Sequence, residues 1–378
     1  MESTKDIKEF INENYGELIK LIEELCKIPA PSHNEEKRAE YCRMWLENLG
    51  AKGVYIDEAL NVVFPLNCEE SDKITVFVAH TDTVFPDTEP MPYVDDGEFI
   101  RCPGVGDDTA SLAVLLMCAK YFVKNGIKPK NGILFVANSC EEGLGNLKGT
   151  RKIFEDYRGR IESFVSFDAN YDSIYDDCVG SHRYEVEVKT EGGHSFGRFG
   201  NKNAIHALAE MVAEIYKIEV PHRENTKTTY NVGIISGGTS VNTIAESASM
   251  LCEYRSDDVS CLKIMEEKFK CIFENARNEK VAVNVTRVGE RPCKDKLDES
   301  KQAALANRLS DVVESVIGKK PVRRSASTDC NIPLSLGVPA LCIGVYMGGG
   351  AHTRAEWVNK KSLITGLEVG LKATLNFV

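Results

Sequence analysis

The sequence predicts an α/β fold that is interrupted by a separate α+β domain. From about residue 54 to residue 167, apolar segments typical of strands alternate with helical segments, which is the pattern of a parallel or mixed sheet. Near Ser181 the pattern changes to the period-two alternation of half-exposed antiparallel strands. From about Cys293 the first pattern resumes. We therefore expect one α/β domain with a mixed central sheet, formed by residues 1–180 and 293–378, and an inserted domain over residues 181–292.

The first part of the chain begins with apolar residues at helical spacing, which predict an amphipathic helix or a helix pair over residues 3–27. A breaker, Ile28-Pro-Ala-Pro-Ser-His-Asn, separates it from a second helix that ends before Gly50. The run from Ile74 to Ala79 lacks alternation, as in a strand buried on both faces. The remaining expected elements are strands over 54–56, 62–64, 132–138 and 163–167 and helices over 35–49, 112–123 and 147–154.

The inserted segment is expected to fold as a ferredoxin-like unit. Its strands are predicted over 184–189, 229–235, 248–254 and 281–288, and its helices over 204–216 and 261–277. The order strand-helix-strand-strand-helix-strand is that of a ferredoxin-like fold. After the insertion, we expect a helix over 302–316, a strand over 339–345, a Gly-rich loop and a last helix.

Composition and charge exclude several classes of function. The chain of 378 residues has 57 acidic and 46 basic residues, a net charge of −11, and no Lys/Arg-rich block. Nucleic acid and anionic membrane are therefore not expected as main partners. No apolar run approaches the ~20 residues of a membrane span, and the N-terminus lacks the apolar core of a signal peptide. We expect a cytoplasmic protein whose 13 cysteines, none in a Cys-x-x-Cys pair, are reduced and mostly buried.

Polar residues that can bind metals follow several of the predicted strands. His80 and Asp82 end the first buried strand, two residues apart and so on one side of an extended chain. Each candidate alone also fits a bland role, since an Asp can cap a helix, an acidic pair can be solvated and a His can lie in a flexible loop. The argument for chemistry is that strand ends of an α/β sheet meet at one edge. The full set is His80, Asp82, Asp107, Glu141, Glu142, Asp168 and His352.

Imidazole and carboxylate ligands without a thiolate suit zinc, cobalt or manganese. Two His and three carboxylates are enough for two metal ions if one carboxylate bridges them, and such a pair can activate one water. An additional carboxylate is then needed as a general base. The adjacent pair Glu141-Glu142 can supply both roles, because neighbouring side chains point in different directions.

Six motifs in this order resemble one known family. They are His80-Thr-Asp82-Thr-Val, Gly104-Val-Gly-Asp107-Asp-Thr-Ala-Ser, Cys140-Glu141-Glu142-Gly, Phe167-Asp168, Gly192-Gly-His194-Ser and Gly350-Ala-His352-Thr-x-x-Glu356-Trp. They are similar to those of the zinc metallopeptidase family that includes acetylornithine deacetylase, succinyl-diaminopimelate desuccinylase, aminoacylase, peptidase T and glutamate carboxypeptidase. The resemblance covers nearly the whole chain, so we expect the α/β domain to be catalytic and zinc-peptidase-like, and the insertion to be a dimerisation or lid domain.

The resemblance also implies the roles of individual residues. One zinc would be held by His80, Asp107 and Asp168, and the other by Asp107, Glu142 and His352, with Asp107 bridging. Glu141 would act as general base on the bridging water, and Asp82 would orient His80. His194 would reach the active site of a dimer partner and stabilise the oxyanion, although a turn residue is the structural alternative. Arg255 and Asn242 resemble positions that bind the substrate carboxylate, and Ser327-Thr-Asp329 resembles another substrate-side loop.

The function expected is that of a dimeric two-zinc hydrolase, with Co²⁺ or Mn²⁺ as possible metals, that cleaves an amide bond in a small carboxylate-bearing substrate. A di- or tripeptidase or carboxypeptidase is preferred over a deacylase of N-acyl amino acids. Two other classes stay open: a catalytically inactive binding relative, and a thiol hydrolase that uses Cys140 or Cys330. Thr109 and Ala110 stand where many relatives have Lys and Gly, which leaves the substrate class open.

Overall fold

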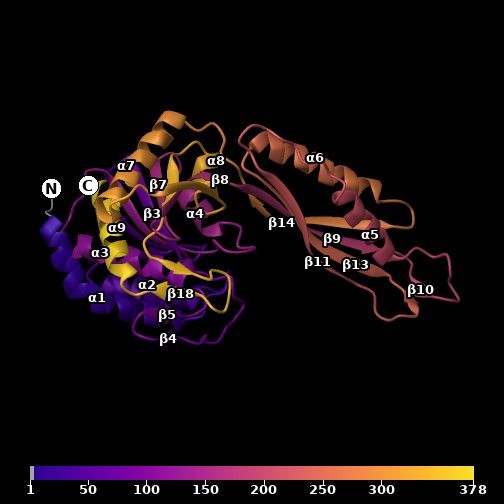
Figure 1. The fold of residues 1–378 in the computed structure, drawn as a ribbon, viewed down its shortest axis with the longest axis horizontal. Helices are drawn as coiled ribbons and strands as arrows, with labels where there is room; N and C mark the ends of the chain where they lie inside the picture. Colours follow the sequence, from indigo (N-terminus) through magenta and orange to yellow (C-terminus); the bar gives the residue numbers. More distant parts are fainter. Residues whose placement is uncertain (1–3) are drawn as a thin grey trace. The chain divides into compact units, whose positions relative to one another are not determined.

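The computed structural model describes residues 4–378, which divide into two compact units (Figure 1). The larger unit ends its first part at Asp177 and resumes at Lys296, and the inserted unit is Cys178–Asp295. The insertion expected over 181–292 therefore lies inside the observed inserted unit, which is three residues longer at each end. The predicted start of the first helix at Ser3 lies outside the described residues.

The larger unit is built on an eight-stranded mixed sheet. Its order is β1 (Tyr55–Ile56), β2 (Val62–Leu66), β6 (Gly132–Asn138), β3 (Ile74–His80), β7 (Ile161–Phe167), β16 (Ala340–Ile343), β8 (Ser173–Cys178) and β15 (Val322–Ala326). The four neighbours β6, β3, β7 and β16 run parallel, so their carboxyl ends lie at one edge. Strands β3 and β6 are buried along their whole length, as their unbroken apolar runs predicted.

Helices and a core of apolar side chains surround this sheet. The helices are α1 (Thr4–Cys26), α2 (Glu36–Asn48), α3 (Ser111–Lys124), α4 (Lys148–Asp156), α7 (Glu299–Ile317), α8 (Asn331–Ser335) and α9 (Ser362–Leu375). Helices α1, α3, α7 and α9 pack against one another in Figure 1. Helix α3 is buried from Ser111 to Phe122, which explains why its sequence is apolar on all sides rather than amphipathic. No helix among residues 4–378 is long and apolar enough to cross a membrane.

A second, small sheet of the larger unit was not predicted from the sequence. Its order is β17 (Gly348–Gly349), β18 (Trp357–Asn359), β5 (Phe99–Arg101) and β4 (Val94–Asp95). These strands are two or three residues long, too short for a period to appear in the sequence. The pairing of β18 with β5 brings the segment after His352 beside the segment before Asp107.

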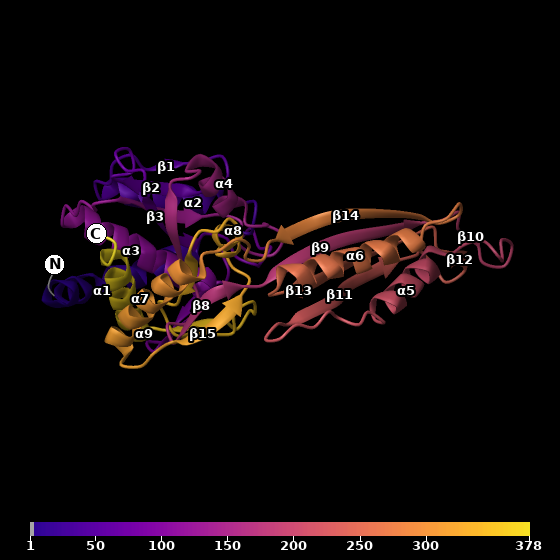
Figure 2. The same cartoon turned by 90° about the horizontal axis from the view of Figure 1, so that it is seen from above.

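The inserted unit has the ferredoxin-like fold that the sequence predicted. Its elements are β9 (Gly180–Lys189), α5 (Ala204–Ile215), β11 (Thr228–Gly237), β13 (Ser247–Ser256), α6 (Val259–Asn275) and β14 (Ala282–Arg291), with a short ribbon of β10 (Gly193–His194) and β12 (Thr243–Ile244). The sheet is antiparallel in the order β11-β13-β9-β14. Both helices cover the same face of this sheet (Figure 2).

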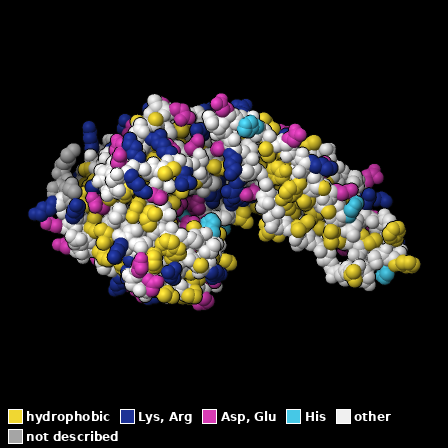
Figure 3. Space-filling model, in the orientation of Figure 1, with side chains coloured by type: hydrophobic (Ala, Val, Ile, Leu, Met, Phe, Trp, Pro, Cys, Tyr) yellow, Lys and Arg dark blue, Asp and Glu magenta, His cyan; other side chains and the backbone are white. Residues whose placement is uncertain are grey.

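The visible surface carries mixed charge. Lys/Arg and Asp/Glu side chains are interspersed over the larger unit, and hydrophobic side chains gather on the visible face of the inserted unit (Figure 3). The thirteen cysteines are unpaired, and only Cys271 among them is exposed.

A buried arginine ties two loops of the larger unit together. The Arg38 side chain is 1% exposed, and burial lowers the pKa of this group. Its guanidinium donates to the backbone carbonyls of Leu25 (2.9 Å), Ile28 (2.6 Å) and Thr81 (2.9 Å). Since Thr81 follows His80, Arg38 fixes the backbone at the end of β3. All three of these acceptors are backbone carbonyls.

Replacing Arg38 with Met should leave the backbone carbonyls of Ile28 and Thr81 without these donors, while the carbonyl of Leu25 keeps the backbone N–H of Ile28. We expect a loss of about 2–4 kcal/mol in the free energy of unfolding and a lower melting temperature by calorimetry. The control is Arg43→Met on the same helix, because Arg43 makes exposed ion pairs with Glu40 and Glu47 and such pairs contribute about 1 kcal/mol or less. Equal melting temperatures for the two variants would contradict this assignment.

Candidate metal centre

Asp82 organises two strand ends at once. The Nδ1 atom of His80 lies 3.0 Å from the backbone oxygen of Asp82 and 3.3 Å from its Oδ1 atom. The same carboxylate accepts the backbone N–H groups of Glu141 and Glu142, each at 2.9 Å, and the hydroxyl of Ser32 at 2.6 Å. Asp82 therefore fixes the ring of His80 and also the backbone of the acidic pair after β6. The sequence predicted the first contact and missed the second.

The loop that carries Asp107 is held by a residue to which the sequence gave no role. The Glu356 carboxylate accepts the backbone N–H groups of Gly104 (2.6 Å), Gly106 (2.8 Å) and Asp107 (2.8 Å). A Cβ atom at Gly106 would lie 2.9 Å from the Glu356 Oε1 atom, so this approach requires glycine. The peptide bond that follows Asp107 is cis. Glu356 belonged to the last motif, and its place there was the only signal for it in the sequence.

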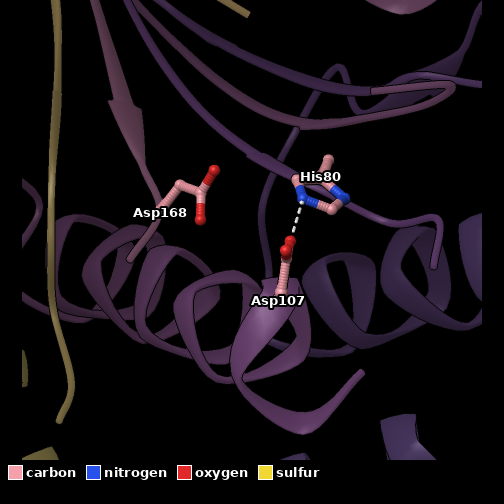
Figure 4. A group of neighbouring side chains, drawn as sticks. All are labelled: His80, Asp107 and Asp168. Atoms are coloured by element: carbon pink, nitrogen blue, oxygen red, sulfur yellow. Dashed lines mark hydrogen bonds and ion pairs between the residues drawn. The ribbon is translucent and has the colours of Figure 1, made fainter. Parts of the chain in front are cut away.

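The structure brings five of the predicted side chains into two overlapping groups. One is His80, Asp107 and Asp168, and the other is Asp107, Glu142 and His352. Within each group, one nitrogen or oxygen atom of every residue lies within 4.8 Å of the others. In Figure 4 the His80 ring and the Asp168 carboxylate both face Asp107.

Asp107 lies between the two histidines. Its Oδ1 atom is 2.9 Å from His80 Nε2, and its Oδ2 atom is 3.1 Å from His352 Nε2. His352 also lies 3.2 Å from the Oε1 atom of Glu142. Asp107 therefore offers one oxygen to each group, which is the arrangement a bridging ligand needs.

The charges of these groups fit bound cations. Burial and the charge of Asp107 raise the pKa of Glu142 to about 7, and the same two causes hold the pKa of Asp168 well above its usual range. Hydrogen bonds to Asp107 and Glu142 raise the pKa of His352 to about 11. Carboxylates gathered with imidazole nitrogens are a donor set for divalent ions of the zinc or manganese type. The residues present therefore fit two such ions.

Glu141 lies beside the two groups without belonging to either. Its side chain is 6% exposed, and its backbone is fixed by Asp82. Its charge contributes to the raised pKa of Asp168 and of Asp329, so its carboxylate lies near both of these groups. Thr109 and Ala110 are buried, and the two groups of possible ligands form beside them.

The surroundings of Cys140, Cys330 and Asp329 indicate structural roles for these residues. Cys140 and Cys330 are buried, and burial raises the pKa of Cys140 to about 12, which disfavours a thiolate nucleophile. Asp329 is 1% exposed and accepts hydrogen bonds from Asn138 (2.7 Å) and Thr150 (2.5 Å). Asp329 therefore braces the larger unit from inside instead of facing a substrate.

The inserted unit carries the other three predicted site residues at two places. His194 and Asn242 are exposed neighbours in the β10–β12 ribbon, where the backbone N–H of Ser195 donates to the carbonyl of Asn242 at 2.9 Å. Arg255 lies in β13 opposite Ser181, at the other end of the four-stranded sheet. Its Nε atom is 2.8 Å from the Oε1 atom of Glu253. Arg255 and Asn242 of one chain therefore do not lie together.

Comparisons with known proteins identify the family of this chain. The model of Peptidase family M20/M25/M40 matches residues 76–376. A succinyl-diaminopimelate desuccinylase from Corynebacterium glutamicum is 24% identical over 352 residues, 90% of this chain and 91% of that protein. A tripeptidase from Staphylococcus aureus has a TM-score of 0.73 and 20% identity, covering 96% of this chain and 98% of that chain. A dinuclear metal-binding peptidase from Bacillus subtilis has a TM-score of 0.64 and 14% identity, covering 96% and 99%.

The two structural likenesses show a shared fold. The family model spans most of the chain and includes the segments that carry all five side chains of the two ligand groups. The protein therefore belongs to peptidase family M20/M25/M40, the family that its motifs resemble.

Proposed function

We propose that this protein is a two-zinc peptidase that cleaves an amide bond in a small peptide. As a member of its family, it is a metal-dependent hydrolase that acts on amide bonds. The observation that supports the finer statement is the pair of ligand groups that share Asp107, with Glu141 adjacent to the ligand Glu142. His80, Asp107 and Asp168 would hold one ion, and Asp107, Glu142 and His352 the other.

The role proposed for each side chain in the hydrolysis follows from its position. Divalent ions at this site would polarise the amide carbonyl and lower the pKa of a water molecule. Glu141 takes a proton from the attacking water and delivers it to the amide nitrogen, so that the C–N bond breaks and the amine leaves. Asp82 keeps its negative charge toward His80 and holds Glu141 in position through the backbone. Water and amide thereby become one carboxylate and one amine.

His194 is proposed as the donor that stabilises the oxyanion in the active site of a second copy. Its Nδ1 atom lies 3.3 Å from the backbone nitrogens of Phe196 and Gly197, which donate to it. The ring therefore carries its proton on Nε2, where it is exposed and free to donate outward. His194 lies in the β10–β12 ribbon, and Arg255 lies near the far end of β13. We therefore propose a dimer in which each active site takes one of these two residues from each chain.

A deacylase of N-acyl amino acids is the second candidate. The relative from Corynebacterium glutamicum is named a desuccinylase, and it matches over 90% of this chain. The tripeptidase from Staphylococcus aureus and the peptidase from Bacillus subtilis favour peptide cleavage, as does the Glu-Glu-Gly-Leu-Gly stretch at residues 141–145. Both reactions use the same residues and differ in what lies on the acyl side of the bond.

Metal reconstitution combined with a substrate screen tests the proposal. Protein stripped by a chelator should be inactive, and two equivalents of Zn²⁺, Mn²⁺ or Co²⁺ per chain should restore hydrolysis. Dipeptides and tripeptides should be cleaved faster than N-acetyl and N-succinyl amino acids, as measured by amine release. Faster cleavage of the acyl amino acids would favour the deacylase. Metal binding without any hydrolysis would favour an inactive binding relative.

The Glu141→Gln variant separates chemistry from metal binding. We expect its metal content to equal that of the wild type, because Glu141 is in neither ligand group. Its kcat should fall by about 10²–10⁴-fold, the usual contribution of a general base. Measurement of bound metal by elemental analysis beside kcat is sufficient. A variant with kcat within tenfold of the wild type would exclude Glu141 as the base.

The Asp82→Asn variant tests the organising carboxylate. The amide that replaces it cannot accept two backbone N–H groups and also face His80, so the ligand set stays complete but loses its fixed geometry. We expect metal affinity and kcat/KM to fall by about 10–100-fold. The control is Asp95→Asn, which removes an ion pair with Lys360 away from the ligand groups. Equal metal affinity in the two variants would overturn the role given to Asp82.

A further inference from the structure

A cavity of about 360 Å³ opens in the larger unit beside the metal-ligand groups. Three of its lining residues are chain neighbours of ligands: Gly106 precedes Asp107, Ala169 follows Asp168 and Ala351 precedes His352. A group that enters this cavity would therefore lie close to the two ligand groups. The kind of substrate group that this cavity binds would then decide part of the substrate specificity.

Arg324 is the only positively charged residue among those that line the cavity. Its Nε atom donates to the hydroxyl oxygen of Ser173 at 3.2 Å, and that hydroxyl donates to the Oδ1 atom of Asp172 at 3.3 Å. This chain of contacts orients the guanidinium and leaves its two terminal nitrogens available. Among residues 4–378, no carboxylate lies within ion-pair distance of Arg324; Asp172 also lines the cavity but is bonded to Ser173 instead.

The preceding residue, Arg323, has its charge paired within the protein. Arg323 lies 3.3 Å from the Oδ2 atom of Asp176 and donates to Asn307 at 2.5 Å. Successive side chains of a strand point to opposite faces, so Arg323 and Arg324 of β15 serve different surroundings. One charge is paired within the protein, and the other is directed to the cavity.

We propose that Arg324 binds a carboxylate of the substrate in this cavity, so that the enzyme selects substrates with a negatively charged group near the scissile bond. This inference rests on the proposed function and adds a substrate class to it. A guanidinium with two free terminal nitrogens matches a carboxylate through paired hydrogen bonds. The charge is also needed locally, because the carboxylates of Asp172 and Glu356 line the same cavity. The carboxylate belongs either to an Asp or Glu side chain or to the free end of a dicarboxylic acyl group.

The test compares charged substrates with neutral ones of the same shape. One pair is Glu-Ala and Gln-Ala, and the other is N-succinyl-alanine and its succinamoyl counterpart. The metal-loaded wild type should prefer the charged member of one pair, and Arg324→Gln should lose about ten- to a hundredfold of kcat/KM on that member with little change on the neutral one. Arg323→Gln is the matched control and should keep the preference, and Arg324→Lys should keep part of it.

The pair that responds identifies the source of the carboxylate. An unchanged charged-to-neutral ratio in Arg324→Gln, or no preference in the wild type, overturns the inference even if hydrolysis is intact. If the wild type hydrolyses none of the four compounds, the wider substrate screen decides the proposed function, and calorimetry tests the cavity by itself. Metal-loaded wild type should bind glutarate more tightly than glutaramate, and Arg324→Gln should lose this difference. Equal binding by both proteins overturns the inference.

Discussion

The site depends on one buried carboxylate that serves two strand ends. Asp82 faces His80 at the end of β3 and accepts the backbone N–H groups of Glu141 and Glu142 after β6. Strands β3 and β6 are parallel neighbours, so their ends are close, but closeness alone does not fix the direction of the side chains that follow. A fully buried anion with four nearby donors does, since any displacement leaves its charge unpaired. The proposed ligands His80 and Glu142 and the proposed base Glu141 thus share one anchor.

Glu356 fixes the loop of Asp107, the proposed bridging ligand, in the same way. Three backbone N–H groups of the loop before and at Asp107 bind one carboxylate from the far end of the chain. Burial raises the pKa of Glu356 to about 7, so these hydrogen bonds offset a real cost of desolvation. The short strands β5 and β18 hold the two segments together at this point. Residues separated by more than two hundred positions are therefore placed by backbone-to-carboxylate bonds, which are rigid, and not by packing of flexible side chains.

The sequence was sufficient wherever a pattern extended over several residues. The unbroken apolar runs of β3 and β6 and the alternation in β9 predicted those strands, and the ends of the parallel strands predicted where polar residues would meet. The strands of the small sheet, such as β17, carry no period and were missed. The longer strands β8 and β15 were missed as well, because their sequences are largely polar. Glu356 was quoted in a motif but given no role, because acceptance of backbone N–H groups leaves no mark on residue type. Only part of the role of Asp82 was predicted, for the same reason. Its contact with His80 follows from their spacing in the sequence, whereas its contacts with Glu141 and Glu142 cannot be predicted from spacing.

The buried residues of this site tolerate substitution less well than the exposed residue Arg324. His80, Asp82 and Glu142 are buried and each contacts at least one other site residue, so a change in one disturbs several others. Arg324 is exposed on the wall of a cavity and contacts only Ser173 by hydrogen bond, so its replacement disturbs nothing that holds a metal. A fold arranged in this way can keep one hydrolytic reaction while its substrate changes. The selective residues then lie on flanking strands such as β15, whose short and polar sequence gives no sign of chemistry before the fold is known.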